Sequence, residues 1–152
     1  MPVLRGHRDL KVYQVAYRLA MEIFKETRTF PQDERYSLTS QIRRSSRSVA
    51  ANVAEAFRKR QYPNMFASKL ADSDAEATET QVWLDFALDC GYLSQEQHRK
   101  LITGYEEVGR MLSSMISHPE RFAPSGWAHC YAPSGLELVF CLLLSTYCLL
   151  PG

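Results

Sequence analysis

Residues 37–60 read SLTSQIRRSSRSVAANVAEAFRKR, and this stretch has the periodicity of a long helix. Its large apolar residues recur at steps of four and seven and form one stripe: Leu38, Ile42, Val49, Val53 and Phe57. Serine and alanine dominate the middle of the stretch, and such short side chains let a second helix approach closely. The pattern predicts a helix that lies at the centre of a helical protein or at an interface.

The segment before this stretch has a similar periodicity. Its apolar stripe consists of Leu10, Tyr13, Tyr17, Ala20 and Phe24. Asp9 suits the N-cap position at its start. The helix should end before Phe30 and Pro31, because a residue that precedes proline avoids helical geometry. We therefore predict a first helix that buries this stripe.

Two more helices follow the quoted stretch. The first begins after Pro63 and ends before Gly91, which suits the left-handed position after a helix; its stripe is Phe66, Leu70, Ala77, Leu84 and Leu88. The second begins at Ser94, whose spacing from Gln97 is that of a capping box, and ends before Pro119. Its stripe is Leu101, Tyr105, Val108, Leu112 and Met115.

Four helices of about 20 residues, joined by short connections, should pack up-down-up-down, because a short link makes neighbouring helices antiparallel. We therefore expect an all-α protein, an up-and-down antiparallel four-helix bundle over residues 8–120. Residues 121–152 differ: APSG occurs at 123–126 and again at 132–135, and a mostly apolar run follows from 138 to 150. We expect a poorly ordered tail outside the bundle. The alternatives are a segment packed on the bundle or in an oligomer interface, and a membrane-touching segment.

Composition excludes several classes of protein. The 152 residues include 18 Lys and Arg and 17 Asp and Glu, a formal net charge of +1, which excludes a histone-like basic protein. No apolar run reaches the roughly 18–20 residues of a membrane span, and the first residues lack the apolar core of a secretory signal. We expect a cytoplasmic protein with reduced thiols. Cys90, at a helix end, should be a small buried residue; Cys130, Cys141 and Cys148 lie in the tail.

The charges are segregated between two neighbouring helices, although they nearly cancel overall. Residues 43–60 carry six basic side chains against the carboxylate of Glu55: Arg43, Arg44, Arg47, Arg58, Lys59 and Arg60. Residues 72–89 carry six carboxylates and no basic side chain: Asp72, Asp74, Glu76, Glu79, Asp85 and Asp89. A helix turns by about 100° per residue, which places four of the basic residues opposite the core stripe, on a surface with little side-chain bulk. These four are Arg43, Arg44, Arg47 and Arg58.

Three interpretations of this basic surface stay open. It can be a solvated face with local ion pairs. It can meet the acidic face of the next subunit in a homo-oligomer, a contact that closes into a ring if the rotation allows; the candidate interface residues are Ala51, Ala54, Asp72, Glu76 and Glu79. It can bind phosphates of RNA or DNA, since arginine forks suit phosphate but carry little sequence information. Tyr36, Phe57 and Tyr62 could then stack on bases, although such aromatics are more often core or interface residues.

Motifs of enzymes and of metal sites are missing from the sequence. Asp72, Glu76 and Glu79 share one helix face, but a di-metal bundle needs Glu-x-x-His on two helices, and this chain has no such motif. No dinucleotide-binding, phosphate-loop, nucleophile-elbow or zinc-protease motif occurs. We expect no catalysis, no metal and no cofactor, and a polar helix face in which carboxylates pair with arginines.

Several short motifs together resemble one bacterial family, the four-helix-bundle 23S rRNA intervening-sequence proteins. They are Asp9-Leu10 with Val12-Tyr13, Phe30-Pro31, Glu34, Tyr36, SQIRRS at 40–45, Ser48-Val49, NVAEA at 52–56, Arg58, ETQVWL at 79–84 and GYL at 91–93. The resemblance covers about residues 8–120. The family usually has glycine where this chain has Ala56.

The resemblance implies an assembly and partners that the residues alone do not. Members of the family form pentameric, barrel-like assemblies and have no established enzymatic activity. The family is also similar to the accessory variability protein of diversity-generating retroelements, which binds a reverse transcriptase and nucleic acid through a basic surface. Arg43, Arg44, Arg47 and Arg58 match the family's basic helix. We therefore expect a non-enzymatic oligomer that binds RNA or DNA; the alternative is a protein-interaction scaffold whose charged faces serve ring assembly.

Overall fold

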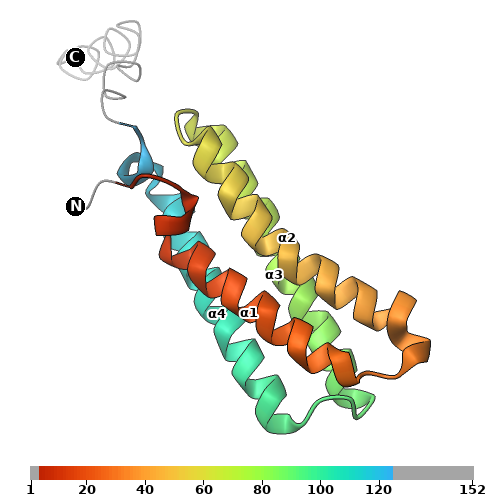
Figure 1. The fold of residues 1–152 in the computed structure, drawn as a ribbon. Coiled ribbons are helices and arrows are strands. Elements are labelled where there is room, and N and C mark those ends of the chain that lie inside the picture. Colours follow the sequence, from red (N-terminus) through yellow and green to blue (C-terminus); the bar gives the residue numbers. More distant parts are fainter. Residues whose placement is uncertain (1–3, 125–152) are drawn as a thin grey trace, which may run out of the picture.

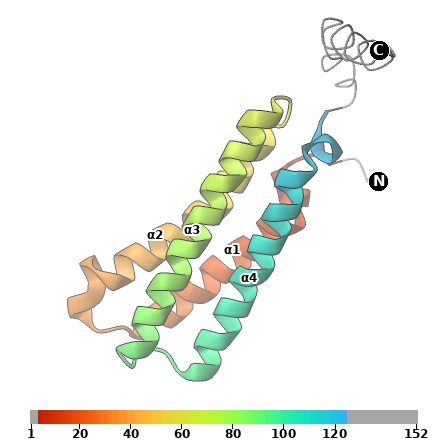
Figure 2. The same cartoon turned by 180° about the vertical axis from the view of Figure 1, so that it is seen from behind.

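The chain folds into four long α-helices. The computed structural model describes residues 4–124, and no strand occurs among them. The helices are α1 (Lys11–Glu26), α2 (Leu38–Lys59), α3 (Pro63–Asp89) and α4 (Gln95–Ser117), and four short 3-10 turns accompany them: η1 (His7–Asp9), η2 (Thr27–Thr29), η3 (Gln32–Tyr36) and η4 (Pro119–Phe122). Each helix packs on the next and α4 closes against α1 (Figures 1 and 2), so the predicted up-and-down bundle is confirmed.

The end signals predicted for α3 and α4 are present in the structure. Ser94 Oγ accepts a hydrogen bond from the Gln97 backbone N–H at 3.2 Å, and the Gln97 side chain accepts one from Ser94 N at 2.8 Å. Gly91 has a φ of 75°, and Pro63 lies in the first turn of α3. The prediction for Asp9 is wrong. Its carboxylate accepts hydrogen bonds from the backbone of Arg5 and Gly6, and Leu10 is the N-cap of α1.

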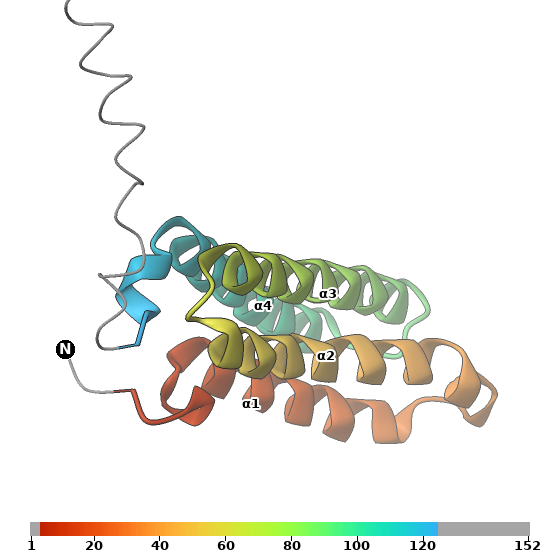
Figure 3. The same cartoon turned by 90° about the horizontal axis from the view of Figure 1, so that it is seen from above.

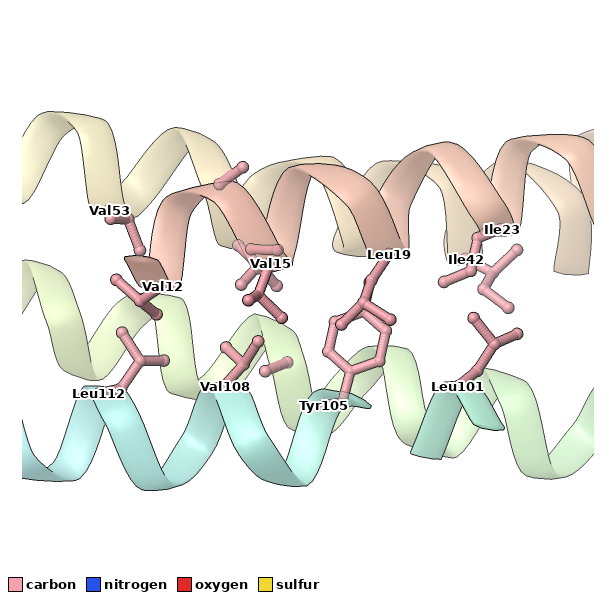
Figure 4. Close-up of a cluster of buried hydrophobic side chains, with 14 of the residues drawn as sticks. Val12, Val15, Leu19, Ile23, Ile42, Val53, Leu101, Tyr105, Val108 and Leu112 are labelled. Atoms are coloured by element: carbon pink, nitrogen blue, oxygen red, sulfur yellow. The ribbon is translucent and has the colours of Figure 1, made fainter. Parts of the chain in front are cut away.

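The core lies along the bundle axis. The stripes predicted for α2 and α4 are buried, as are all residues of the α3 stripe except Leu88, which is half-buried. The view in Figure 4 shows Val12, Val15 and Leu19 of α1 pointing toward Tyr105 and other labelled side chains of α4. Among residues 4–124, no helix has the length and apolar character needed to cross a membrane.

The stripe predicted for α1 is correct for Leu10 and Ala20, which are buried, and wrong for its three aromatic residues. The helix buries Val12, Val15, Ala16, Leu19 and Ile23 instead, together with Ala20. Tyr17 is 55% exposed, and Tyr13 and Phe24 are only half-buried. Both stripes have helical spacing and lie on adjacent sides of the helix, about 100° apart. Packing against α4 selects the aliphatic stripe, because its short side chains fit between close helices, whereas tyrosine hydroxyls keep contact with water.

Small polar residues make the contact between α2 and α3 close. Ser45 and Thr80 are completely buried, and their hydroxyl oxygens lie 2.9 Å apart across the two helices. Ser73 Oγ donates a hydrogen bond of 2.9 Å to the backbone carbonyl of Val49. These bonds satisfy polar groups that would otherwise be costly to bury. The predicted close approach of a second helix to residues 37–60 is therefore confirmed, and α3 is that helix.

One end of the bundle is filled by the residues after α4. Figures 1 and 2 show the α2–α3 hairpin diverging from α1 and α4 at the end where residues 4 and 124 lie. There Phe122 of η4 packs on the fully buried Phe66, with ring centroids 5.7 Å apart. The predicted boundary between bundle and tail at residue 120 thus falls within η4. Residues 125–152, with the rest of the predicted tail, lie outside the described residues.

Substitution by alanine should change the stability of the protein in opposite directions at two glycines of α4. A Cβ at Gly104 would lie 2.5 Å from Leu19 Cδ2 in the core, whereas one at Gly109 would meet only Asp74 Oδ1 at 3.4 Å. Alanine favours a helix by about 1 kcal/mol over glycine, but overpacking a core costs about 1–3 kcal/mol. Gly109→Ala should therefore exceed Gly104→Ala in free energy of unfolding by about 1–3 kcal/mol in urea denaturation. Equal stability of the two variants would contradict the close contact between α1 and α4.

Candidate nucleic-acid interface

The outward side of α2 carries Arg43, Arg44, Arg47 and Arg58, which we call the basic face. Arg44, Arg47 and Arg58 are exposed and Arg43 is half-buried, while Ile42, Val49 and Val53 on the opposite side are completely buried. The predicted orientation of α2 is therefore correct. The structure also places Arg43 and Arg47 at the edge of the helix next to α1 and Arg44 at the edge next to α3.

The edge next to α1 concentrates positive charge. The guanidinium carbons of Arg43 and Arg47 lie 4.9 and 5.9 Å from the ring centroid of Phe24 on α1. Arg43 Nε donates a hydrogen bond of 2.7 Å to Thr27 Oγ1, which orients its side chain. Burial lowers the pKa of Arg43, and repulsion from Arg47 and Arg28 lowers it further. The basic face thus holds like charges close together at this edge, and a bound anion would relieve that repulsion.

The positive charge at the edge next to α3 is partly neutralised by carboxylates. Arg44 Nη2 lies 3.3 Å from Glu79 Oε1, and the same oxygen accepts a hydrogen bond of 3.0 Å from Trp83 Nε1. Further along, Lys69 Nζ lies 3.1 Å from Glu55 Oε2 and 3.2 Å from Asp72 Oδ2, and bonding to these carboxylates raises its pKa. The basic and acidic helices therefore pair within one chain at their contact. This pairing is the local ion pairing that the first interpretation predicted.

Lys59 and Arg60 lie apart from the basic face. Arg60 follows the last residue of α2; its Nη1 donates a hydrogen bond of 2.8 Å to the Phe57 carbonyl, and its guanidinium carbon lies 3.9 Å from the Phe57 ring centroid. Such a bond satisfies a carbonyl left free at the helix end. Arg60 thus closes the end of α2, and Lys59 is half-buried. Of the six basic residues predicted at positions 43–60, Arg47 and Arg58 are open to solvent and have no ion pair among residues 4–124.

The candidate interface residues lie on two surfaces. Ala51 is exposed and Ala54 half-buried on the outer side of α2, between Arg47 and Arg58 along the helix. The three carboxylates share a face as predicted and line a shallow groove between α2 and α3, formed by Asn52, Lys69, Asp72, Ala75, Glu76 and Glu79. Within residues 4–124, one carboxylate oxygen of Glu76 is buried without a hydrogen-bond partner, and no cluster of His, Cys, Asp or Glu is arranged to hold a metal ion.

The family of the chain follows from comparison with known proteins. A family model described as 23S rRNA-intervening sequence protein matches residues 8–114. The chain belongs to this family. The predicted resemblance is therefore confirmed over nearly the range expected. None of the curated proteins matches the chain.

A solved structure supports the fold of this chain. It is the crystal structure of a protein with unknown function from the S23 ribosomal protein family of Bacteroides thetaiotaomicron. The two chains are 27% identical, with a TM-score of 0.63 over 70% of this chain and 95% of the other. The match confirms the four-helix fold. Because the relative has no stated function, we infer a function for this chain from its surface geometry.

Sequence reasoning missed the residues of α1 that border the basic face. Tyr13, Tyr17 and Phe24, which we call the aromatic edge, share one side of α1 at steps of four and seven. Phe24 meets Arg43 and Arg47, so this side of α1 faces the outer part of α2. The signal was present in the sequence, because the first helix carries two apolar stripes. Periodicity alone could not show which of the two was buried. Cys90, predicted to be buried, is exposed at the end of α3.

Proposed function

We propose that this protein binds the phosphate backbone of RNA or DNA through the basic face, without catalysis. The observation that carries the proposal is the edge next to α1, where Arg43 and Arg47 converge on Phe24 with Arg28 nearby. Among residues 4–124, no carboxylate lies within ion-pair distance of Arg43, Arg47 or Arg58. Guanidinium groups bind phosphate in bidentate fashion, and like charges held close together favour an anionic ligand.

The same geometry favours binding without base specificity. Phosphate contacts orient a nucleic acid but do not read its sequence. The exposed Ala51 leaves little bulk between Arg47 and Arg58, so that a backbone can approach α2 closely. Family membership supports the proposal only indirectly, because the family's description names an RNA and states no binding activity.

Salt dependence tests the proposal. Contacts from three arginines to three phosphates should give a slope of log affinity against log salt of about −2 to −3. Affinity for a structured RNA should therefore fall about 16- to 64-fold between about 50 and 200 mM salt. Fluorescence anisotropy of a labelled RNA measures this fall, and size-exclusion chromatography with light scattering reports the mass of the complex. An affinity that salt leaves unchanged would contradict phosphate binding.

A second candidate function is a protein-interaction scaffold that assembles with itself. The observation that favours it is the outward side of α3, where Val82 and Phe86 are 45% and 53% exposed and continue a line of exposed Ala71 and Ala75. Exposed apolar surface of this kind often marks a contact with another protein. In this candidate, the acidic residues beside the line would meet the basic face of a neighbouring copy. Light scattering of the free protein distinguishes an oligomer from a monomer.

A further inference from the structure

We propose that the aromatic edge stacks on unpaired bases, so that the protein prefers single-stranded RNA or DNA to a duplex. The inference rests on the proposed function, because the basic face supplies the phosphate contacts. It adds a second component of binding, from Tyr13 and Tyr17 on α1, that a duplex cannot use.

The two tyrosines form an open stacking surface. Their ring centroids lie 6.1 Å apart with 29° between the planes, and the His7 ring contacts Tyr13 edge-on at 4.8 Å. His7 and the core support Tyr13, which is half-buried, while Tyr17 is 55% exposed. The stack therefore continues toward solvent, and the free face of Tyr17 can accept another flat ring. An aromatic ring offers this platform to every base, since every base has a π-face.

Antiparallel packing places this stack along the basic face. Phe24 meets Arg43 and Arg47, so earlier residues of α1 lie beside later residues of α2. The turn η1, just before α1, packs on α2 as well. Tyr17 and Tyr13 consequently lie alongside the part of α2 between Arg47 and Arg58, where Ala51 and Ala54 project little. Arg47 and Arg58 are separated by about 16 Å along the helix. A single strand whose phosphates contact both arginines can turn its bases toward the tyrosines.

The pairing state of the nucleic acid decides whether the stack contributes. In a duplex the base faces are covered by neighbouring pairs, and only phosphates and groove edges are available. A single strand can splay its bases onto aromatic side chains. Duplex and single strand should therefore share the arginine contacts, while the tyrosines should strengthen binding of the single strand alone.

Substitutions of Tyr17 separate this inference from the proposed function. Affinities are measured by anisotropy for an unstructured oligouridine and for an RNA duplex with the same number of phosphates. Tyr17→Leu keeps apolar bulk but removes the π-face, and Tyr17→Phe keeps the ring. Tyr17→Phe is the matched control, because it differs from Tyr17→Leu in keeping the aromatic ring.

Tyr17→Leu should weaken binding of the oligouridine about 5- to 10-fold and leave duplex binding unchanged. Tyr17→Phe should bind both probes as the wild type does. Equal affinity of Tyr17→Leu and the wild type for oligouridine, or an equal loss on both probes, overturns the inference but leaves the phosphate proposal standing. A change in mass of Tyr17→Leu by light scattering would overturn it also, because Tyr17 would then belong to a subunit contact. A wild type that binds neither probe overturns both proposals.

Discussion

The double variant Arg47→Glu/Arg58→Glu is expected to lose nucleic-acid affinity about 100-fold or more at low salt. Both arginines are exposed on the basic face, and neither has an ion pair among residues 4–124. A hydrogen bond to a charged group contributes about 1.5 kcal/mol or more, so that losing two costs about 3 kcal/mol, and the new carboxylates repel phosphate in addition. The salt slope should flatten by about 2. Titration of labelled RNA at several salt concentrations measures both quantities.

The chain offers a close control for this variant. Arg99 and Arg110 on α4 are both exposed and have the same spacing of 11 residues as Arg47 and Arg58. Arg99→Glu/Arg110→Glu therefore changes the net charge by the same amount on another helix, and it should retain most of the affinity. Equal losses in the two double variants would mean that overall charge, and not the basic face, attracts RNA.

Light scattering of the same variant distinguishes the two candidate functions. Arg47→Glu/Arg58→Glu should keep the mass of the wild type if the basic face serves nucleic acid. A variant that loses an oligomer present in the wild type would instead support the scaffold, because the arginines would then meet the acidic face of a neighbouring copy. The variants therefore give different results under the two proposals.

Phe66→Ala is expected to lower the free energy of unfolding by about 3–5 kcal/mol. Phe66 is completely buried near the start of α3 and supports the Phe122 ring from η4. Truncation leaves a cavity at the end where the α2–α3 hairpin diverges from α1 and α4. Because a domain is stable by only about 5–15 kcal/mol, this single change should remove much of the total. Urea denaturation followed by circular dichroism measures it.

Phe86→Ala provides the comparison on the same helix. Phe86 is 53% exposed, so its truncation should cost less than about 1 kcal/mol. A loss below about 1 kcal/mol in Phe66→Ala as well would contradict the packing of this end, since a Phe66 side chain already in contact with water would lose little on truncation.

Most of the fold could be predicted because its signals are local. The stripes of α2 and α4 are buried as predicted, and the capping box at Ser94 and the left-handed Gly91 are present. These features depend on helical period and on the chemistry of a few adjacent residues. The basic face could be predicted for the same reason, since one helix with a known core stripe determines which arginines point outward.

The details of the site required contacts between helices. Arg44 is partly neutralised by Glu79, Arg60 closes the end of α2, and Arg43 packs on Phe24. In the sequence these residues appear equivalent to Arg47 and Arg58. The partners of Arg43 and Arg44 lie on other helices, and no spacing within α2 reveals them. Arg60 instead bonds to Phe57, three residues earlier at the end of α2.

Local periodicity was therefore sufficient for the number of helices, their order and the outward direction of the arginines. Tertiary packing decided which side of α1 is buried, which arginines stay free and where the aromatic edge lies. The physical reason is that two apolar stripes on one helix satisfy the helical period equally well. Only the helices that pack against α1 distinguish the two stripes, because short aliphatic side chains fit the narrow space between α1 and α4. This packing leaves Tyr13 and Tyr17 beside the basic face.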